Sequence, residues 1–543
     1  MASESPALDE GDPEGPDSES PPTSSRRVAT NRDDEPTSGD DQRKARLSFL
    51  LASIFVVSAC AITYELLVGA VASYLLGNSV RQFSLTIGVF LASMGIGAWI
   101  SQWFHDQLLD GFVGVEIALS TAGGVSGWLL LWAFTYTQQY YLVMFGLIIV
   151  VGTLIGLELP LLTRYLRQFA SLRQALARVM SLDYLGALAA SVAFPLVLLP
   201  WLGVFRTSVA VGLFNVAVAF ATTALFWREL RHPLRLVGAS VMVAVALVIG
   251  LFRAAPVLSK MERDLYQDTV IYASQSSYQR IVMTRHNEDL RLYLEGSLQF
   301  SSMDEYRYHE ALVHPALSAT PWRQEVLVIG GGDGLAVREV LRHADVKKVV
   351  LVDLDPAVTE LATSHPALVA LNGDSLRDPR VTVINDDGYS YLRNHAGRYG
   401  AIFIDLPDPS REALAKLYSV SFYRMVSDHL SRGGIAVTQA TSPMFARRSF
   451  WGIAATVEAA GLHATPYHTY VPSFGDWGFV MMSPEPHDLA TVQLAVTTTS
   501  LSAELLPTMT RFAPDIGPMP VEASTLERPT ILGYYDESMS RWR

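Results

Sequence analysis

The chain is 543 residues long, half of them hydrophobic, with a net charge of −12 and a mean hydropathy of +0.24. That length predicts more than one domain, and a positive hydropathy beside an acid excess predicts an uneven composition. An acidic chain without a basic stripe argues against a nucleic-acid partner. The single cysteine, Cys60, excludes a disulfide framework and a cysteine metal site.

Residues 1–45 are rich in Ser, Pro, Asp and Glu and carry almost no large apolar residue. Such a segment cannot bury a core, so we expect a disordered acidic tail. It lacks the basic start and short apolar run of a cleavable signal peptide.

Residues 46–256 are expected to form a multi-pass helical membrane domain. A large soluble helical core would need polar faces at helical spacing, which this region lacks. The segment 47–77 is long enough for a helix and a re-entrant piece, so the number of crossings stays open. Seven runs are long enough to cross a bilayer: 47–69, 83–103, 112–134, 140–163, 183–203, 207–227 and 236–254.

Arginines are concentrated before the first run, between the fourth and fifth, and between the sixth and seventh. The positive-inside rule places these three segments in the cytoplasm. Seven crossings would then leave the C-terminal half outside the cell, which conflicts with the cytosolic chemistry that its own residues indicate. One crossing more or fewer would remove the conflict, and we expect a cytoplasmic C-terminal half in a protein of the inner cell membrane. The arginines are Arg43 and Arg46, then Arg164, Arg167, Arg173 and Arg178, then Arg228, Arg231 and Arg235.

Three acids, Glu65, Glu116 and Glu158, lie within or near the apolar runs. Buried intramembrane acids are costly and often mark a transport path or a binding site. An acid at the interface, or one hydrogen-bonded to a neighbouring helix, would have no such role. Both interpretations stay open, and no cargo is indicated.

After Arg253 the sequence becomes typical of a soluble α/β protein. Short alternating segments in 266–300 predict a small antiparallel sheet within a β-rich subdomain, 257–322. We expect a Rossmann-like domain over 323–490, and residues 491–543 form a C-terminal extension without a clear signal.

A glycine-rich loop organises the Rossmann-like domain. The buried strand Val326–Ile329 runs into Gly330-Gly-Gly-Asp333-Gly334, and a second strand ends at Asp353. This strand–loop–helix–strand layout is typical of nucleotide binding, with the second acid on the ribose. A carboxylate inside the loop would repel a pyrophosphate, so Asp333 favours a cationic adenosyl sulfonium over NAD.

The segment Gln299–Pro315, the Gly330-Gly-Gly-Asp-Gly loop and Asp405-Leu-Pro-Asp408-Pro409 together resemble the spermidine synthases, the polyamine aminopropyltransferases. The resemblance covers about residues 260–485. Soluble members lack the apolar half, so the chain is similar to the bacterial membrane-fused branch. The resemblance implies a class I methyltransferase-like Rossmann fold and transfer of an aminopropyl group from decarboxylated S-adenosylmethionine to putrescine or a related amine. It also implies a possible homodimer, with the donor as a co-substrate rather than a tightly bound cofactor.

An amine that is protonated at neutral pH must lose a proton before it can attack, and a carboxylate within reach can take that proton. Asp405 ends the strand Tyr399–Asp405 at the carboxyl edge of the sheet, where α/β ligands bind. By resemblance Asp405 is the catalytic proton acceptor and no metal is implied. The donor site is implied to contain Gln279, Gly330, Gly332, Asp333, Asp353, Asp387 and Gly388. The amine site is implied to contain Tyr308, His309, Asp333, Asp405, Asp408 and Gln439.

Two segments depart from the family pattern on the amine side. Ser410-Arg411-Glu412 stands where soluble members have a Gly-Pro step, and the segment from Pro472 to Trp477 lacks the tyrosine that closes on the polyamine. Two other classes of function remain. An S-adenosylmethionine-dependent methyltransferase would not need both Asp405 and Asp408. A membrane transporter or sensor would bind a polyamine or nucleoside without turnover.

Overall fold

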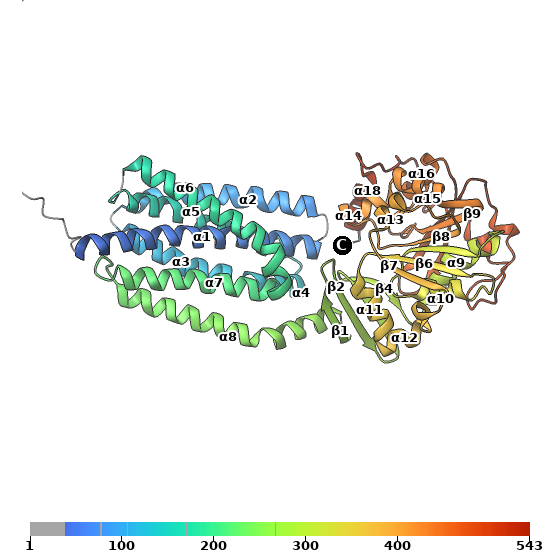
Figure 1. Cartoon of the computed structure of the whole chain (residues 1–543), viewed down its shortest axis with the longest axis horizontal. Coiled ribbons are helices and arrows are strands. Elements are labelled where there is room, and N and C mark those ends of the chain that lie inside the picture. The colour runs from blue at the N-terminus through green and yellow to red at the C-terminus, as the bar shows by residue number, and fades with distance from the viewer. Residues whose placement is uncertain (1–37, 77–78, 106, 170, 267, 543) are drawn as a thin grey trace, which may run out of the picture. The chain divides into compact units, whose positions relative to one another are not determined.

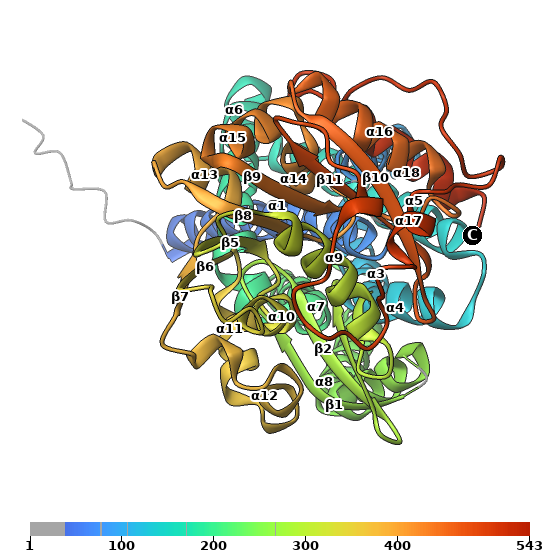
Figure 2. The same cartoon turned by 90° about the vertical axis from the view of Figure 1, so that its right-hand side faces the viewer.

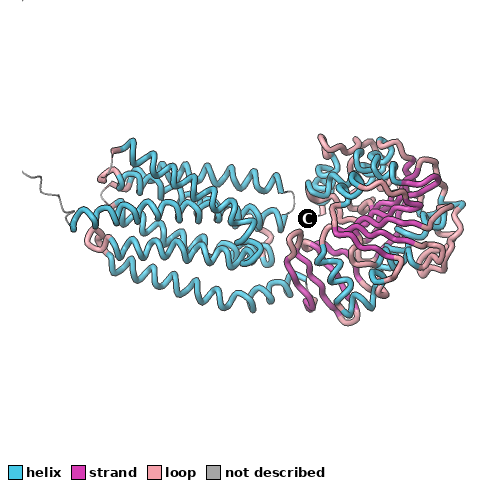
Figure 3. The backbone as a smooth tube through the Cα atoms, viewed as in Figure 1, coloured by secondary structure: helices cyan, strands magenta, loops and turns pink. Residues whose placement is uncertain are grey.

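The computed structural model describes residues 38–76, 79–105, 107–169, 171–266 and 268–542. Most of the expected disordered tail, 1–45, therefore lies outside the described residues, and its last part already belongs to helix α1. Every strand of the described residues follows position 268, as the strand colouring in Figure 3 makes clear.

The first half of the described chain is helical (Figure 1). By length and composition it contains six stretches that are apolar enough to cross a membrane. Helices α2 and α5 approach so closely that a Cβ on Gly156 would lie 2.1 Å from the carbonyl oxygen of Met94. Such small-residue contacts are common between membrane helices. The helices are α1 (Ser38–Leu76), α2 (Ser79–Ile100), α3 (Leu108–Gly124), α4 (Ser126–Tyr136), α5 (Tyr140–Leu166), α6 (Leu172–Ala193), α7 (Leu199–Leu225) and α8 (Pro233–Tyr266).

One of the six stretches, Leu172–Leu225, holds two helices. A short π-helical segment, η2 (Phe194–Leu198), follows α6, and Gly203 near the start of α7 has φ 69° and ψ 178°, outside the helical region. The hydroxyl of Thr207 donates to the carbonyl of Leu198 at 3.2 Å, across the bend. The chain therefore reverses here, and α6 and α7 are separate helices (Figure 1).

A four-stranded antiparallel sheet begins the second half, where the sequence predicted short alternating strands. Its order is β1-β2-β3-β4, so consecutive strands are neighbours. The strands are β1 (Thr269–Gln275), β2 (Arg280–His286), β3 (Asp289–Leu294) and β4 (Ser297–Ser301).

The larger sheet has seven strands in the order β10-β11-β9-β8-β5-β6-β7 (Figure 2). Strands β9, β8, β5, β6 and β7 run parallel, and β11 pairs antiparallel with both β9 and β10. The chain leaves β5 toward β6 and β7, then returns to the other side of β5 with β8. Ligands of open α/β sheets bind at the carboxyl ends of the strands at such a switch point. The strands are β5 (Glu325–Gly330), β6 (Lys348–Asp353), β7 (Val381–Asn385), β8 (Tyr399–Asp405), β9 (Leu430–Gln439), β10 (His463–Val471) and β11 (Gly475–Ser483).

Helices cover both faces of this sheet, and apolar residues from each face form two buried clusters. The last helix, α18, packs on α16, where Arg448 pairs with Glu537 at 2.5 Å and lies over the ring of Tyr534. The C-terminal extension thus packs on the domain of the seven-stranded sheet. The helices are α9 (Glu305–Ala319), α10 (Leu335–Leu341), α11 (Pro356–Ser364), α12 (Pro366–Asn372), α13 (Gly388–Asn394), α14 (Glu412–Ala415), α15 (Val420–His429), α16 (Arg447–Ala459), α17 (Leu506–Met509) and α18 (Thr530–Ser540).

Candidate active site

The glycine loop after β5 passes between two acids of the neighbouring strands. Gly330 has φ 79°, and a Cβ there would lie 2.0 Å from the carbonyl oxygen of Asp405. A Cβ on Gly332 would lie 2.6 Å from Oδ2 of Asp353, and the Gly332 N–H donates to that same oxygen at 3.0 Å. A side chain at either position would displace an acid from the site.

The end of β6 carries linked polar groups. Oδ1 of Asp353 accepts the N–H of Asp355 at 2.9 Å, and the amide of Gln279 donates to Asp355 at 3.1 Å. Burial raises the pKa of Asp353 to about 6, although the N–H groups of Asp355 and Gly332 lower it. The structure thus brings Gln279 to the ribose end of the predicted donor site, where it bonds to Asp355 rather than to Asp353.

Asp387 and Gly388 follow β7 at the same edge of the sheet. The side chain of Asp387 caps α13 by accepting the N–H of Ser390 at 2.9 Å, and it pairs with Lys416 at 2.7 Å. Burial acts to raise the pKa of Asp387, but Lys416 and the cap outweigh it, so the pKa is lowered. A Cβ on Gly388 would lie 2.6 Å from Cγ2 of Ile329, which explains the small residue there.

Asp333 lies at the turn between the glycine loop and α10. Its Oδ1 accepts the N–H of Leu335 at 2.9 Å, and the side chain is 9% exposed. Burial raises its pKa to about 6, with the charge of Asp405 adding to the rise and that of His309 opposing it. Asp333 is therefore close to both Asp405 and His309, as the predicted amine site requires.

Asp405 ends β8 opposite Gly330. The hydroxyl of Tyr308 donates to Oδ1 of Asp405 at 2.6 Å, and Nε2 of His309 lies 4.0 Å from Oδ2. Burial raises the pKa of Asp405, while His309 and Tyr308 lower it. A carboxylate held in this way can accept a proton from a ligand in the site.

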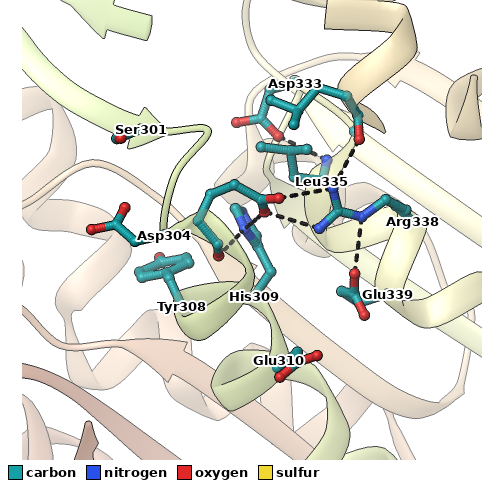
Figure 4. Close-up of polar contacts among 12 residues, drawn as sticks. Ser301, Asp304, Tyr308, His309, Glu310, Asp333, Leu335, Arg338 and Glu339 are labelled. Atoms are coloured by element: carbon teal, nitrogen blue, oxygen red, sulfur yellow. Dashed lines mark hydrogen bonds and ion pairs between the residues drawn. The ribbon is translucent and has the colours of Figure 1, made fainter. Parts of the chain in front are cut away.

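A chain of ion pairs from Arg338 through Glu305 fixes the ring of His309 at its Nδ1 atom (Figure 4). Nδ1 of His309 lies 2.8 Å from Glu305, and Arg338 donates two hydrogen bonds of 2.9 Å to the same carboxylate. Burial lowers the pKa of His309, but Glu305, Asp405 and Asp333 outweigh it and raise the pKa to about 9. An imidazolium therefore faces Asp405 at neutral pH.

Asp408 is held mainly by neutral groups. The hydroxyl of Tyr535 on α18 donates to Oδ2 of Asp408 at 2.9 Å, and that of Thr441 lies 3.4 Å from the same oxygen. Within the described part of the chain, Oδ1 of Asp408 is buried without a hydrogen-bond partner. Burial raises the pKa of Asp408 to about 6, and Tyr535, Gln439 and Thr441 lower it. The unpartnered oxygen can accept a hydrogen bond from a cationic ligand.

Gln439, which is predicted to contact the amine, also makes hydrogen bonds to the backbone near Asp405 and Asp408. Its Nε2 donates to the carbonyl of Leu406 at 2.7 Å and to the hydroxyl of Tyr418 at 2.6 Å, and its Oε1 accepts the N–H of Thr441 at 2.9 Å. Gln439 thereby fixes the turn between Asp405 and Asp408.

The two segments that depart from the family pattern also border the site. Ser473 bonds to Asp304, and the ring of Phe474 lies 6.1 Å from that of Tyr308, so this segment contributes an aromatic wall. Arg411 pairs with Glu295 at 3.0 Å and ties the loop after Asp408 to the small sheet.

Three potential metal ligands, Glu310 and His314 on α9 and Glu339 on α10, lie together, although the sequence suggested no cluster of ligands. Arg342 and Arg338 already pair with Glu339 at 2.5 Å and 2.9 Å. Glu310 accepts the N–H groups of residues 499 and 500 at 2.7 Å and 2.8 Å. With guanidinium groups present, this cluster is an ion-pair network that joins α9 and α10 to the C-terminal extension.

Sequence reasoning missed Glu305, Arg338 and Tyr535. Glu305 precedes His309 by four residues on one helix, a spacing that predicts side-chain contact. Arg338 could be suspected from its place one turn into the helix after the glycine loop. Tyr535 lies 127 residues from Asp408, and no local pattern points to it.

Comparison with known proteins gives a consistent result. The spermine/spermidine synthase domain family matches residues 305–494. Polyamine aminopropyltransferase 2 of Ralstonia nicotianae is 45% identical over 90% of this chain and 98% of its own length. The polyamine aminopropyltransferase of Leptospira interrogans is 41% identical over 91% and 99%. The crystal structure of spermidine synthase from Thermotoga maritima matches 50% of this chain and 88% of its own, with 24% identity and a TM-score of 0.39.

The relatives match along almost the whole chain, so the similarity extends over the apolar half as well as the catalytic half. The resemblance inferred from the sequence is confirmed: the chain is a transferase and belongs to the spermidine synthase family of polyamine aminopropyltransferases.

Proposed function

We propose that the enzyme transfers the aminopropyl group of decarboxylated S-adenosylmethionine to putrescine, giving spermidine and methylthioadenosine. The nitrogen of putrescine attacks the aminopropyl carbon next to sulfur, and the carbon–sulfur bond breaks with its electron pair going to sulfur. Asp405 takes the proton that the attacking amine must lose. The observation that carries this proposal is the pair of contacts on Asp405: the hydroxyl of Tyr308 donates to it at 2.6 Å, and Nε2 of His309 lies 4.0 Å away.

The two substrates would occupy opposite sides of the β5–β8 switch point. Asp353 would hold the ribose, Asp387 and Gly388 would border the adenine, and Gln279 would contact the nucleoside. Asp333 would bind the ammonium of the aminopropyl group. Its place two residues after Gly331 supports this role, because a Cβ on Gly331 would lie 2.9 Å from Oδ2 of Asp405 and the loop therefore passes close to the attacking amine.

Asp408 would hold the far ammonium of putrescine. Support comes from its buried oxygen, which has no partner among the described residues, and from a pKa of about 6, which leaves it charged at neutral pH. A diamine with one end at Asp405 and the other at Asp408 would be fixed at both ends before reaction.

We further propose that the helical half spans a membrane seven times, because one of its six apolar stretches holds two helices. Large apolar side chains on its surface support this proposal; Trp201 is 79% exposed, Phe252 80% and Leu142 69%. By the family resemblance, two chains would pair through their β1–β4 sheets.

We propose that the catalytic half lies in the cytoplasm, where its donor is made. With seven crossings, the arginine-rich segments then lie on the opposite side of the membrane, against the positive-inside rule. Cys60 is buried, so a cysteine introduced at the exposed Glu485 reports the side. A membrane-impermeant maleimide should label Glu485→Cys in broken cells only. Labelling in intact cells would place the domain outside.

The activity is tested with the full chain in detergent, incubated with decarboxylated S-adenosylmethionine and putrescine. Wild type should form methylthioadenosine and spermidine in equal amounts, and Asp405→Asn should form both at least about 10²-fold more slowly. Turnover only with another amine would keep the chemistry and change the acceptor. No turnover with any amine, despite nucleoside binding, would overturn the proposal.

A further inference from the structure

The helical half contains a largely apolar pocket of about 330 Å³, lined by residues of α3, α4, α7 and α8. Its floor is closed, because Val209 of α7 and Val243 and Leu247 of α8 are buried. Its rim is open, since Trp128 is 39% exposed and Ala246 is exposed as well. The pocket therefore opens on the outer surface of the helical half.

Gly250 borders empty space in this pocket. The residue is half-buried, yet a Cβ built on it would meet no atom of the described residues within 4 Å. On the facing helix, by contrast, a Cβ on Gly124 would lie 2.7 Å from Cδ2 of Leu247. The helices thus touch at Gly124 and leave room beside Gly250, where a ligand can enter without moving them.

Arg253 is the only charged residue among the lining residues that the structure describes. It is exposed, and it makes no hydrogen bond or ion pair with the described residues. A guanidinium presents a planar fork of N–H groups that matches two oxygens of a phosphate. The pocket thus offers a free cation at one end of an apolar space.

The pocket is about as deep as one leaflet of a bilayer. Its lining on α8 runs from Val243 to Arg253, which is about 15 Å of helix. The hydrocarbon core of a bilayer is roughly 30 Å thick. Arg253 is also the last residue of the apolar stretch Pro233–Arg253. In a membrane the pocket would therefore begin at the interface and end near the midplane, as one acyl chain does.

Two hydrogen bonds place Trp128 toward the same end of the pocket as the guanidinium. Asp110, at the start of α3, accepts the N–H of Arg231, just before α8, at 3.1 Å. Tyr136, at the end of α4, donates to Asp264, near the end of α8, at 2.5 Å. The stretch Leu108–Tyr136 therefore runs alongside α8 in the same direction. Tryptophan is enriched at the level of lipid headgroups, which agrees with a cationic end at the interface.

We propose that this pocket binds one acyl chain of an anionic phospholipid, whose phosphate is held by Arg253. The site rests on the proposal that the helical half spans a membrane. Basic residues between membrane helices are suited to anionic headgroups. A zwitterionic phospholipid brings its own ammonium close to the guanidinium, whereas an anionic phospholipid leaves its charge for Arg253 alone.

The test counts the phospholipids retained per chain, by native mass spectrometry of the full-length protein in detergent with added phosphatidylglycerol or phosphatidylcholine. Wild type should retain one phosphatidylglycerol more than Gly250→Leu, because the leucine side chain fills the space of the acyl chain. Gly238→Leu is the matched control. It lies on α8, a Cβ there also meets no described atom within 4 Å, and it does not line the pocket, so it should retain as many lipids as wild type.

A second pair of variants tests the charge. Arg253→Gln keeps the pocket and removes the cation, so half-occupancy should need at least about tenfold more phosphatidylglycerol, the loss expected for one hydrogen bond to a charged group. Arg206→Gln, at an exposed position of α7 outside the lining, should leave this concentration unchanged. Both arginines are exposed, so neither substitution should alter the packing of the helices.

Four outcomes would overturn the site. Equal counts of phosphatidylglycerol in wild type, Gly250→Leu and Arg253→Gln would do so, as would equal retention of the two lipids by wild type. Dimers of wild type that dissociate in Gly250→Leu would assign the pocket to a second copy of the chain instead. Recovery of wild type from broken cells without detergent would refute the membrane proposal together with the site. Recovery only with detergent, but with unchanged lipid counts, would refute the site alone.

Discussion

The proposed donor side and the proposed amine side of the active site are built in different ways. The acids of the proposed donor side lie at the ends of three adjacent parallel strands, β5, β6 and β7, or in the turns that follow them, and Gln279 joins them from the turn before β2. The amine side also starts from a strand end, at Asp405, but it is completed by α9, by the segment around Phe474 and by Tyr535 of α18. A site made of strand ends is fixed by the sheet, whereas one made of added segments can change its ligand without changing the sheet.

The groups that surround the two acids of the proposed amine side also differ in charge. Asp405 faces an imidazolium that Glu305 maintains, whereas Asp408 receives neutral hydroxyl groups. Asp405 is thus tuned by a remote ion-pair chain, and Asp408 by contacts that single substitutions can remove.

The largest expected effect is that of Asp405→Asn. Loss of the proton acceptor should lower kcat by about 10²- to 10⁴-fold, the usual contribution of general-base catalysis. The dissociation constant for methylthioadenosine, measured by calorimetry, should stay unchanged if the two sides are independent. A large loss of nucleoside affinity in this variant would show that Asp405 also builds the donor side.

Asp353→Asn should weaken nucleoside binding and leave the KM for putrescine unchanged. Removing the charge that would accept the ribose hydroxyls should weaken methylthioadenosine binding by roughly 10- to 150-fold, the equivalent of about 1.5–3 kcal/mol for a hydrogen bond to a charged group. The KM for putrescine should be that of wild type. A rise in both constants would mean that Asp353 mainly supports the loop through Gly332.

Glu305→Gln should change the pH dependence more than the rate at high pH. Without the glutamate, the pKa of His309 falls below about 9, so the imidazolium is lost at a lower pH and no longer lowers the pKa of Asp405 there. Asp405 then keeps its proton to higher pH, and the acid limb of kcat/KM should move upward by as many pH units as that pKa rises.

The matched control is Glu310→Gln, one turn further along α9, whose carboxylate accepts the N–H groups of residues 499 and 500 and does not contact His309. Its profile should coincide with that of wild type. Coincident profiles for both variants would contradict a positioning role for Glu305.

Tyr535→Phe should have the smallest effect. Losing one neutral hydrogen bond should raise the KM for putrescine by roughly 2- to 12-fold, or about 0.5–1.5 kcal/mol. Tyr535 lowers the pKa of Asp408, so its removal should raise that pKa above about 6, and the increase in KM should be greater at pH 6 than at pH 8. Tyr534→Phe, whose ring lies under Arg448, serves as control and should leave KM unchanged at both pH values.

The sequence was sufficient to predict which acids lie at strand ends. A run of apolar residues followed by Gly or Asp has few interpretations other than a buried strand and the turn after it. The sequence predicted that Asp353 and Asp405 end strands and that Asp333 lies in the glycine loop, and the parallel register places these strand ends at one edge of the sheet. Tyr535 could not be predicted, since its contact with Asp408 depends on how α18 packs on α16. The same limit applies to Gln439, whose hydrogen bonds to Leu406 and Tyr418 become visible only once the turn is folded.

The bend at Gly203 has a consequence for the whole chain. A straight helix of the 54 residues in Leu172–Leu225 would be about 80 Å long, more than twice the roughly 30 Å of a bilayer core. In the proposed topology of seven passes, this bend is what makes the number of passes odd. An odd number would place the segment before α1 and the active site in different compartments. A reporter fused ahead of α1 would identify the compartment of the active site by exclusion, without any change to the catalytic half.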